Sequence, residues 1–333
     1  MNIPIRVMKG FCIMQPVKLI PPVKDYIWGG TKLKEEYSIQ TDLPKAAEAW
    51  MLSCHRDGAS IVSGGGYDGQ TLEAVIEQEG KGILGKNADR FDYFPVLIKL
   101  IDARDNLSVQ VHPDNEYARI HEGEYGKTEA WYILECEEGA SLIYGFKRPI
   151  SKEEMRDRIE KNTLLEVVNQ VPVRRGDLFF IESGTLHAIG KGILLAEVQQ
   201  NSNTTYRVYD YGRIGADGKP RALHVEKALD VTRCEPPAHP VGPAEKPERF
   251  EWGTSTLQAS CEFFTFRTLD LHGAASFEAD SSSFISLVVL DGDGTLTFEG
   301  GKIELRKGES IFIPAGTGAY TLSGALQVLE TKV

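Results

Sequence analysis

Short apolar runs, each bounded by turn-forming residues, dominate the hydrophobic pattern in the middle of the chain. Runs of this length that are rich in Val, Ile, Leu and aromatic residues are typical of β-strands. They occupy 94–102, 107–112, 130–135, 140–146, 177–182 and 192–200. Two stretches, 71–79 and 151–170, instead carry apolar residues at helical spacing, and Ser151 followed by Glu154 is a capping-box pattern. The pattern predicts an all-β chain with short helical segments.

One strand–turn–strand pattern occurs twice in the chain. "GDLFFIESGTLHAI" begins at Gly176 and "GESIFIPAGTGAYT" begins at Gly308. Upstream of each copy lie two further strand-like runs around an acidic glycine turn, "YILECEEGASLIYGF" and "LVVLDGDGTLTFEGG". Two copies of one β unit predict two related barrels, each built as a double-sheet jelly roll. One position differs in chemistry, because His187 of the first copy corresponds to Ala319 of the second.

A proline-rich stretch separates the two copies. Five prolines fall within 235–247, which is typical of a linker. Beyond it, Ala319 offers no lone pair to a metal and His272 is the one histidine, so we expect the second copy to be metal-free. The predicted organisation is an N-terminal extension at 1–14, a first domain at 15–234 with a helical insertion near 151–170, a linker at 235–249, and a second domain at 250–333.

Composition and charge limit the partners and the cellular compartment that we expect for this chain. The 333 residues carry a formal net charge of −11, which repels nucleic acid and anionic lipid. No run of 18 apolar residues is present, so no membrane-spanning helix is predicted. The five cysteines are scattered without CxxC spacing, which argues against a disulfide framework and for a reducing compartment. We therefore expect a cytoplasmic protein that has no nucleic-acid or membrane partner.

The strand "LSVQVH" has an unusual polar face. Successive side chains of a strand point to opposite faces, so Ser108, Gln110 and His112 lie on one face while two valines lie on the other. Pro113 ends the strand because it has no N–H to donate. A face with a hydroxyl, an amide and an imidazole lines either a polar cavity or an exposed surface.

Four residues combine into a candidate metal site. Two imidazoles, one carboxylate and one amide oxygen suit a divalent ion such as Zn²⁺, Fe²⁺, Mn²⁺ or Co²⁺, with positions left open for water or substrate. The candidate ligands are Gln110, His112, Glu129 and His187. Gln110 is the weakest of them, because glutamine is an uncommon zinc ligand.

The same motifs carry a family resemblance. The Gly-x5-x-x-Gly-x-x-His stretch from Gly176 resembles the second motif of the cupin superfamily. Together with "FPVLIKLIDARDNLSVQVHPDNEYA", "GKTEAWYIL" and "YIWGGTKL", it resembles the type I phosphomannose isomerases in their short bacterial form, over about residues 15–333. The resemblance implies two cupin-like jelly-roll barrels, one Zn²⁺ per chain and a sugar-phosphate substrate. It leaves open whether the protein is a monomer or a homodimer.

The resemblance also assigns roles to individual residues. The zinc ligands of the family fall on the four candidates above. Its catalytic arginine falls on Arg207, an active-site acid on Glu197 and an active-site lysine on Lys127. Its phosphate-binding lysine and serine fall on Lys99 and Ser108. The chain departs from longer relatives where they carry a lysine six residues after the arginine, because it has Arg213 there, and it has one short helical insertion in place of a helical domain.

The implied reaction interconverts mannose 6-phosphate and fructose 6-phosphate through an enediolate. A metal would stabilise negative charge on the sugar oxygens as a Lewis acid, and Arg207 would add a fixed positive charge. Two candidates remain for the base that removes the proton from C2, namely Glu197 and a metal-bound hydroxide. Two rival functions are an iron-dependent oxygenase, which cupin barrels also support, and a non-catalytic sugar-phosphate-binding module.

Overall fold

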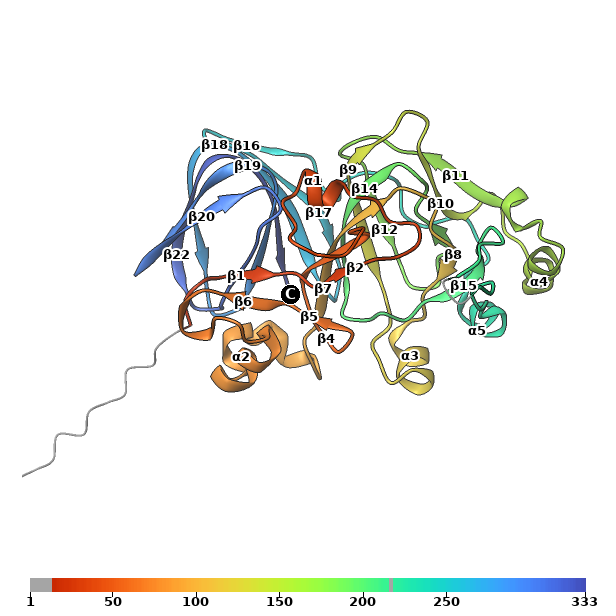
Figure 1. The fold of residues 1–333 in the computed structure, drawn as a ribbon, viewed down its shortest axis with the longest axis horizontal. Helices are drawn as coiled ribbons and strands as arrows, with labels where there is room; N and C mark the ends of the chain where they lie inside the picture. The colour runs from red at the N-terminus through yellow and green to blue at the C-terminus, as the bar shows by residue number, and fades with distance from the viewer. Residues whose placement is uncertain (1–13, 216–217) are drawn as a thin grey trace, which may run out of the picture.

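The computed structural model describes residues 14–215 and 218–333, so nearly all of the predicted N-terminal extension lies outside the described residues. The described chain is mostly β with short helices, which confirms the predicted class. Its strands form a six-stranded, a five-stranded, a nine-stranded and a small two-stranded sheet, all with antiparallel pairings. Figure 1 shows the long C-terminal strands grouped on one side and the remaining sheets beside them.

The six-stranded sheet lies at the centre of the molecule. Its order is β12 (Leu178–Ile181), β9 (Glu129–Cys136), β14 (Ile193–Gln200), β7 (Val96–Ala103), β3 (Glu48–Leu52) and β2 (Val23–Lys24). One face of β9 carries Ala130 and Tyr132, which pack in a core shared with the nine-stranded sheet. The other face carries Trp131 and Ile133, which pack against the five-stranded sheet. Burial on both faces explains why these strands read as nearly continuous apolar runs.

The five-stranded sheet covers the inner face of the six-stranded sheet. Its order is β11 (Val168–Pro172), β10 (Ser141–Phe146), β13 (His187–Ala188), β8 (Val109–Val111) and β15 (Tyr206–Tyr209). Val109 and Val111 pack on the outer face, in a core that includes residues of α4 (Lys152–Glu160) and α5 (Val225–Val231). The polar face of β8 therefore points inward, between two sheets, so this strand does not simply present its polar residues to solvent.

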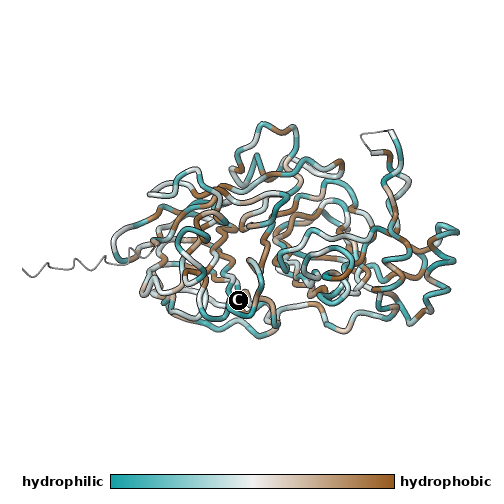
Figure 2. Tube along the Cα trace, turned by 90° about the horizontal axis from the view of Figure 1, so that it is seen from below, coloured by the Kyte–Doolittle hydropathy of each residue, from teal (hydrophilic) through white to brown (hydrophobic). Residues whose placement is uncertain are grey.

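The nine-stranded sheet contains the C-terminal strands and two strands from the N-terminal part. Along its path lie β16 (Glu248–Phe250), β17 (Gly253–Ser260), β18 (Thr265–Ala279), β22 (Gly318–Lys332), β19 (Ile285–Phe298), β21 (Ser310–Ile313), β1 (Val17–Ile20) and β6 (Ile61–Ser63), with β20 (Gly301–Arg306) paired to β19. The two-stranded sheet is β4 (Cys54–His55) with β5 (Gly58–Ala59). In Figure 2 hydrophobic stretches of the trace gather toward the interior, whereas peripheral loops are more hydrophilic.

The helices test the second part of the hydrophobic pattern. The six predicted strands and the predicted helix at 71–79 are confirmed, the latter as α2 (Leu72–Glu79) with Thr71 as its N-cap. Ser151 caps α4 as expected, by accepting from the N–H of Glu154. The remaining helices are α1 (Lys32–Glu35) and α3 (Asn115–His121).

The predicted helix at 151–170 is wrong beyond residue 160. Asn162 adopts a left-handed conformation with φ of 59°, a geometry that stops an α-helix and that asparagine tolerates. A short 3₁₀ turn (Leu164–Glu166) and β11 follow it. Leu164 and Val168 continue the apolar pattern without being helical, because they reach the same core as α4 from a turn and a strand. No helix within 14–215 and 218–333 is long and apolar enough to cross a membrane.

Candidate metal centre

The register of the five-stranded sheet brings three predicted residues into one row. Gln110 of β8 pairs with His187 of β13 on one side and with Arg207 of β15 on the other. Directly paired residues of antiparallel strands point to the same face, with their Cβ atoms about 5 Å apart. The row therefore aims an amide, an imidazole and a guanidinium into the space between the two sheets.

The six-stranded sheet supplies a second row that faces the first. Glu197 of β14 pairs with Trp131 of β9 and with Lys99 of β7, which in turn pairs with Trp50. Glu129 lies two residues before Trp131, so the two side chains share the inner face of the sheet. The charged residues of this row are buried, with Glu129 fully buried and Glu197 and Lys99 each 3% exposed.

Backbone carbonyls fix the imidazoles of His112 and His187. The carbonyl oxygen of Thr204 lies 2.8 Å from Nδ1 of His112, and that of Thr185 lies 2.8 Å from Nδ1 of His187. A carbonyl oxygen can only accept a hydrogen bond, so each Nδ1 carries the ring proton and each Nε2 presents its lone pair, which in His112 faces the Lys127 ammonium at 3.2 Å. A partner on the second ring nitrogen is the usual arrangement around a metal-binding histidine.

The two Nε2 atoms converge on one carboxylate. The Nε2 atoms of His112 and His187 lie 3.1 Å apart. They lie 3.6 and 3.4 Å from the Oε2 and Oε1 atoms of Glu129, respectively. Oε1 of Glu129 is buried and accepts no hydrogen bond. Lone pairs that face one another in a dry interior are unfavourable unless a cation lies between them, so the donor set fits a divalent metal.

The protonation states of the donors support this interpretation. Burial, reinforced by the nearby ammonium of Lys127, holds the pKa of His112 well below its usual range. Burial lowers the pKa of His187 to about 4, so both rings are neutral at pH 7. Burial and the neighbouring Glu197 raise the pKa of Glu129, a penalty on its charge that a bound cation would relieve.

Two lysines connect the metal donors to Glu197. Nζ of Lys127 lies 2.8 Å from Oε2 of Glu129 and 3.8 Å from Oε1 of Glu197. Nζ of Lys99 lies 3.0 Å from Oε1 of Glu197 and 3.6 Å from Oε2 of Glu48. Burial alone would raise the pKa of Glu197, but the two lysines outweigh it and lower that pKa. Glu197 is therefore a carboxylate held between two ammonium groups.

Arg207 and Ser108 form a separate pair at the edge of this space. Nε of Arg207 donates to Oγ of Ser108 at 3.1 Å, and Nη1 donates to the carbonyl of Ala222 at 3.2 Å. Burial and the nearby Arg221 lower the pKa of Arg207. Positive charge therefore accumulates beside a buried hydroxyl, which suits an anionic ligand.

The structure brings most of the predicted site together and adds residues that sequence reasoning missed. His112, Glu129, His187, Lys127, Glu197 and Lys99 form one connected cluster; Gln110 and Arg207 share a row with His187, and Ser108 contacts Arg207. Glu48 and the indole of Trp131, which donates to Glu197 at 2.8 Å, were missed, as were the carbonyls of Thr185 and Thr204. The spacing of two residues between Glu129 and Trp131 is a sequence signal that both side chains share one face of the strand. A backbone carbonyl leaves no such signal in the sequence.

These features define a β protein with a candidate metal site between two packed sheets. A family model described as phosphomannose isomerase type I, catalytic domain, matches residues 17–140, and one described as mannose-6-phosphate isomerase, cupin domain, matches residues 254–333. The chain is 40% identical over 321 residues to mannose-6-phosphate isomerase ManA of Bacillus subtilis, which covers 96% of this chain and 99% of that protein. The chain belongs to the type I phosphomannose isomerase family.

Further relatives extend the comparison. Mannose-6-phosphate isomerase of Streptococcus mutans is 37% identical over 95% of this chain and 98% of its own length. The crystal structure of mannose 6-phosphate isomerase from Bacillus subtilis superposes with a TM-score of 0.88 at 35% identity, covering 96% of this chain and all of that one. A mannose 6-phosphate isomerase bound with zinc and yttrium shares the fold, with a TM-score of 0.75 at 20% identity over 96% of this chain and 99% of that one.

Proposed function

We propose that this protein is a zinc-dependent isomerase that interconverts mannose 6-phosphate and fructose 6-phosphate. The observation that carries the proposal is the convergence of two Nε2 atoms, 3.1 Å apart, on the Glu129 carboxylate, with both Nδ1 atoms held by carbonyls. The names of the relatives support the substrate, and the structure neighbour that contains zinc supports the metal. The oxygenase and binding-module alternatives gain no support from these comparisons.

One metal ion per chain would be held by His112, Glu129 and His187, with the amide oxygen of Gln110 as a fourth donor. The cation would supply Lewis-acid stabilisation of the negative charge that develops on the sugar oxygens. Lys127 lies 3.2 Å from Nε2 of His112 and would hold a second positive charge beside the same oxygens.

Glu197 is the carboxylate that we assign to proton transfer between C2 and C1. It is ionised and buried, so it can accept a proton in a site from which bulk water is excluded. Its lowered pKa makes it a weak base while Lys99 and Lys127 are both in contact with it. We infer that substrate binding draws at least one lysine toward the sugar phosphate, which raises the basicity of Glu197 when it is needed.

The anionic end of the substrate would bind at Ser108 and Arg207, which already form a hydrogen-bonded pair. Lys99 stays a predicted phosphate ligand, although its ammonium is in contact with Glu48 and Glu197. Kinetics of Lys99→Ala distinguish a phosphate ligand from a counter-ion for Glu197. Loss of a phosphate contact would mainly raise KM, whereas loss of a counter-ion for Glu197 would lower kcat and change its pH profile.

The finer architecture also belongs to this proposal. We infer two cupin-like jelly-roll barrels, at 15–234 and 250–333, joined by the linker at 235–249. Separate hydrophobic cores within each unit and the match of the cupin-domain model to 254–333 support this division. Pairing of β1 with β21 ties the N-terminal strands to the second unit.

We expect the protein to act in the cytoplasm on a small-molecule substrate. Cys54, Cys136, Cys234 and Cys261 form no disulfide, which is in keeping with a reducing compartment. Monomer and homodimer are both compatible with the proposal, and light scattering of the purified protein distinguishes them.

A coupled assay for fructose 6-phosphate formation under nitrogen, combined with metal analysis of the same sample, tests the function. We expect oxygen-independent turnover with one zinc ion per chain. Turnover that requires oxygen would identify an oxygenase instead, and tight binding of mannose 6-phosphate without turnover would identify a binding protein.

A further inference from the structure

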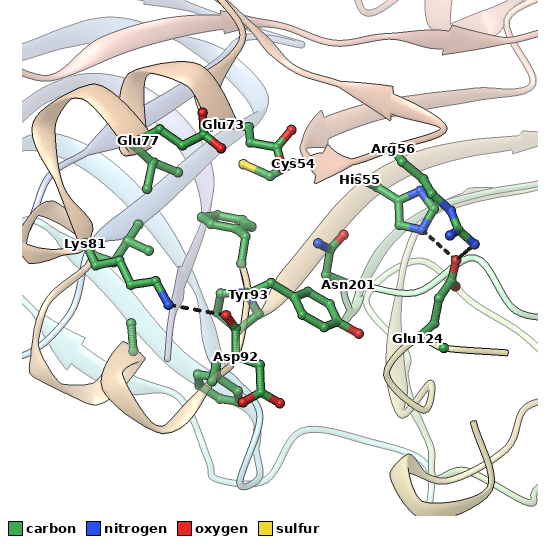
Figure 3. Close-up of a pocket in the computed structure, with 17 residues that line it drawn as sticks. Cys54, His55, Arg56, Glu73, Glu77, Lys81, Asp92, Tyr93, Glu124 and Asn201 are labelled. Atoms are coloured by element: carbon green, nitrogen blue, oxygen red, sulfur yellow. Dashed lines mark hydrogen bonds and ion pairs between the residues drawn. The ribbon is translucent and has the colours of Figure 1, made fainter. Parts of the chain in front are cut away.

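A cavity of about 340 Å³ lies beside α2 and the loop at 91–95, and none of the predicted site residues lines it. Figure 3 shows its lining, with His55, Arg56 and Glu124 together at one side and their contacts dashed. His55 and Glu124 are largely buried, at 5% and 9% exposure. A buried carboxylate away from the proposed catalytic cluster needs its own explanation.

One carboxylate oxygen of Glu124 faces the side chains of Arg56 and His55 at the cavity. Oε1 accepts from the guanidinium of Arg56 and lies 3.5 Å from Nε2 of His55. The N–H of Asp57 donates to Nδ1 of His55 at 3.1 Å, so Nδ1 is an acceptor and Nε2 is the ring nitrogen that can donate toward Glu124. The hydrogen bond from His55 outweighs burial and lowers the pKa of Glu124 to about 2, so the carboxylate is ionised at neutral pH.

The other oxygen of Glu124 holds the turn at 202–204. Oε2 accepts from the hydroxyl of Ser202 at 3.3 Å, from the N–H of Asn203 at 3.2 Å and from the hydroxyl of Thr204 at 3.3 Å. Three donors from three consecutive residues on one charged acceptor fix the course of the backbone there. Ser202 is fully buried, so water cannot easily replace these contacts.

The same turn contacts the metal donors. The carbonyl of Thr204 is the group that lies 2.8 Å from Nδ1 of His112. Thr204 therefore connects Glu124 to His112: its hydroxyl donates to Glu124 and its carbonyl contacts the imidazole. Glu124 itself does not contact the metal donors. Moving the Thr204 carbonyl would remove the partner that keeps the ring proton on Nδ1 and aims Nε2 at Glu129.

We propose that Glu124 is a positioning residue of the metal centre, whose carboxylate fixes the 202–204 turn so that the Thr204 carbonyl holds His112 in its metal-binding tautomer and orientation. The inference rests on the proposed metal site and is independent of the sugar substrate. Groups that hydrogen-bond a ligating histidine change metal affinity by about 10–100-fold when they are removed, and Glu124 acts on such a group, the Thr204 carbonyl, without contacting the histidine.

The test measures metal affinity of the purified chain by competition with a chromophoric zinc chelator. Glu124→Ala removes the acceptor, and Glu124→Gln keeps one amide oxygen but loses the charge. The matched control is Glu154→Ala, which removes a carboxylate that accepts from Arg148 and Arg158 on the surface of α4. We expect a zinc Kd up to about 10-fold higher for Glu124→Ala, because it disturbs the Thr204 carbonyl without removing it, a smaller increase for Glu124→Gln, and no change for the control.

A second readout uses the metal-free protein. In ¹⁵N–¹H spectra of its imidazoles, we expect the His112 signal to report Nδ1–H in the wild type and a mixture of tautomers in Glu124→Gln. A folded Glu124 variant with an unchanged zinc Kd and an unchanged His112 tautomer would overturn the inference, and Glu124→Gln serves where Glu124→Ala does not fold. A protein that binds zinc tightly but lacks isomerase activity would refute the proposed function and leave this inference standing.

Discussion

The two copies of the strand–turn–strand unit share one backbone arrangement but differ in the side chains that it positions. In the first copy β9 pairs with β12 so that Glu129 lies opposite Ile181. In the second copy β19 pairs with β21 in the same way, and Ile285 lies opposite Ile313. The carboxylate of the first copy is thus replaced by an aliphatic side chain that is 1% exposed and packs in an apolar core.

The histidine position differs in its surroundings as well as in its residue. His187 starts β13 and is fully buried where it faces the six-stranded sheet, whereas Ala319, near the start of β22, is exposed and pairs with the exposed Glu278. The candidate donors of the first domain converge from two sides, because His187 belongs to the five-stranded sheet, His112 directly follows β8 of that sheet, and Glu129 belongs to the six-stranded sheet. The candidate site therefore depends on three positions and on a facing sheet, more than on the repeated unit itself.

Removal of the two imidazoles is the most severe way to test the comparison. In His112→Ala/His187→Ala we expect zinc to fall from one per chain to less than about a tenth, because each ring supplies a direct bond. Isomerase activity should fall with it. His272→Ala, which removes the exposed histidine of β18, is the control. Full zinc occupancy of the double variant, measured by mass spectrometry of dialysed protein, would refute the assignment.

A core substitution in the second copy should act on stability alone. The ring of Phe312 is fully buried and stacks on Phe284, with centroids 5.3 Å apart. Phe312→Ala should lower the free energy of unfolding by about 3–5 kcal/mol, because it leaves a cavity. Phe250→Ala, at a position that is 47% exposed, should cost less than about 0.5 kcal/mol. Urea titration measures both, and a folded Phe312→Ala with greatly reduced kcat would show that the second copy takes part in catalysis.

A guanidinium of each copy can be compared in the same way. Arg207→Ala should lower kcat by about 10²-fold or more with normal zinc content, because a fixed positive charge near the reacting oxygens is lost. Arg267 donates to Ser255 within the second copy, and Arg267→Ala should leave kcat unchanged. Steady-state kinetics on both variants decide the matter, and equal effects would mean that Arg207 is a structural residue.

The pKa of Glu129 predicts how zinc binding depends on pH. Its raised pKa means that the carboxyl group holds a proton at a higher pH than usual, and this proton competes with the metal. Zinc affinity should therefore fall as the pH falls, by at most about tenfold per unit for one proton. The pKa of His187 is lowered to about 4, so that imidazole adds no competition above this pH. A zinc Kd that is constant between pH 5 and 7.5 would contradict the prediction.

The accuracy of sequence reasoning differed between strands, helix ends and the site. Alternation along 107–112 predicted the two faces of β8, because packing on one side fixes the register of such a strand. The end of α4 was missed because the left-handed Asn162 overrides an apolar pattern that continues past it. The Thr204 carbonyl and Glu124 could not be found from sequence, since their roles come from contacts between residues 78 to 92 positions apart.

The smallest expected effect comes from restoring the missing histidine of the second copy. Ala319→His places an imidazole at the position that corresponds to His187. We expect no additional zinc, because the new side chain would face solvent beside Glu278 and no facing sheet would supply a second imidazole. Stability should change by less than about 0.5 kcal/mol, as is usual for an exposed position. Two zinc ions per chain in this variant would show that the repeated backbone by itself carries the capacity to bind metal.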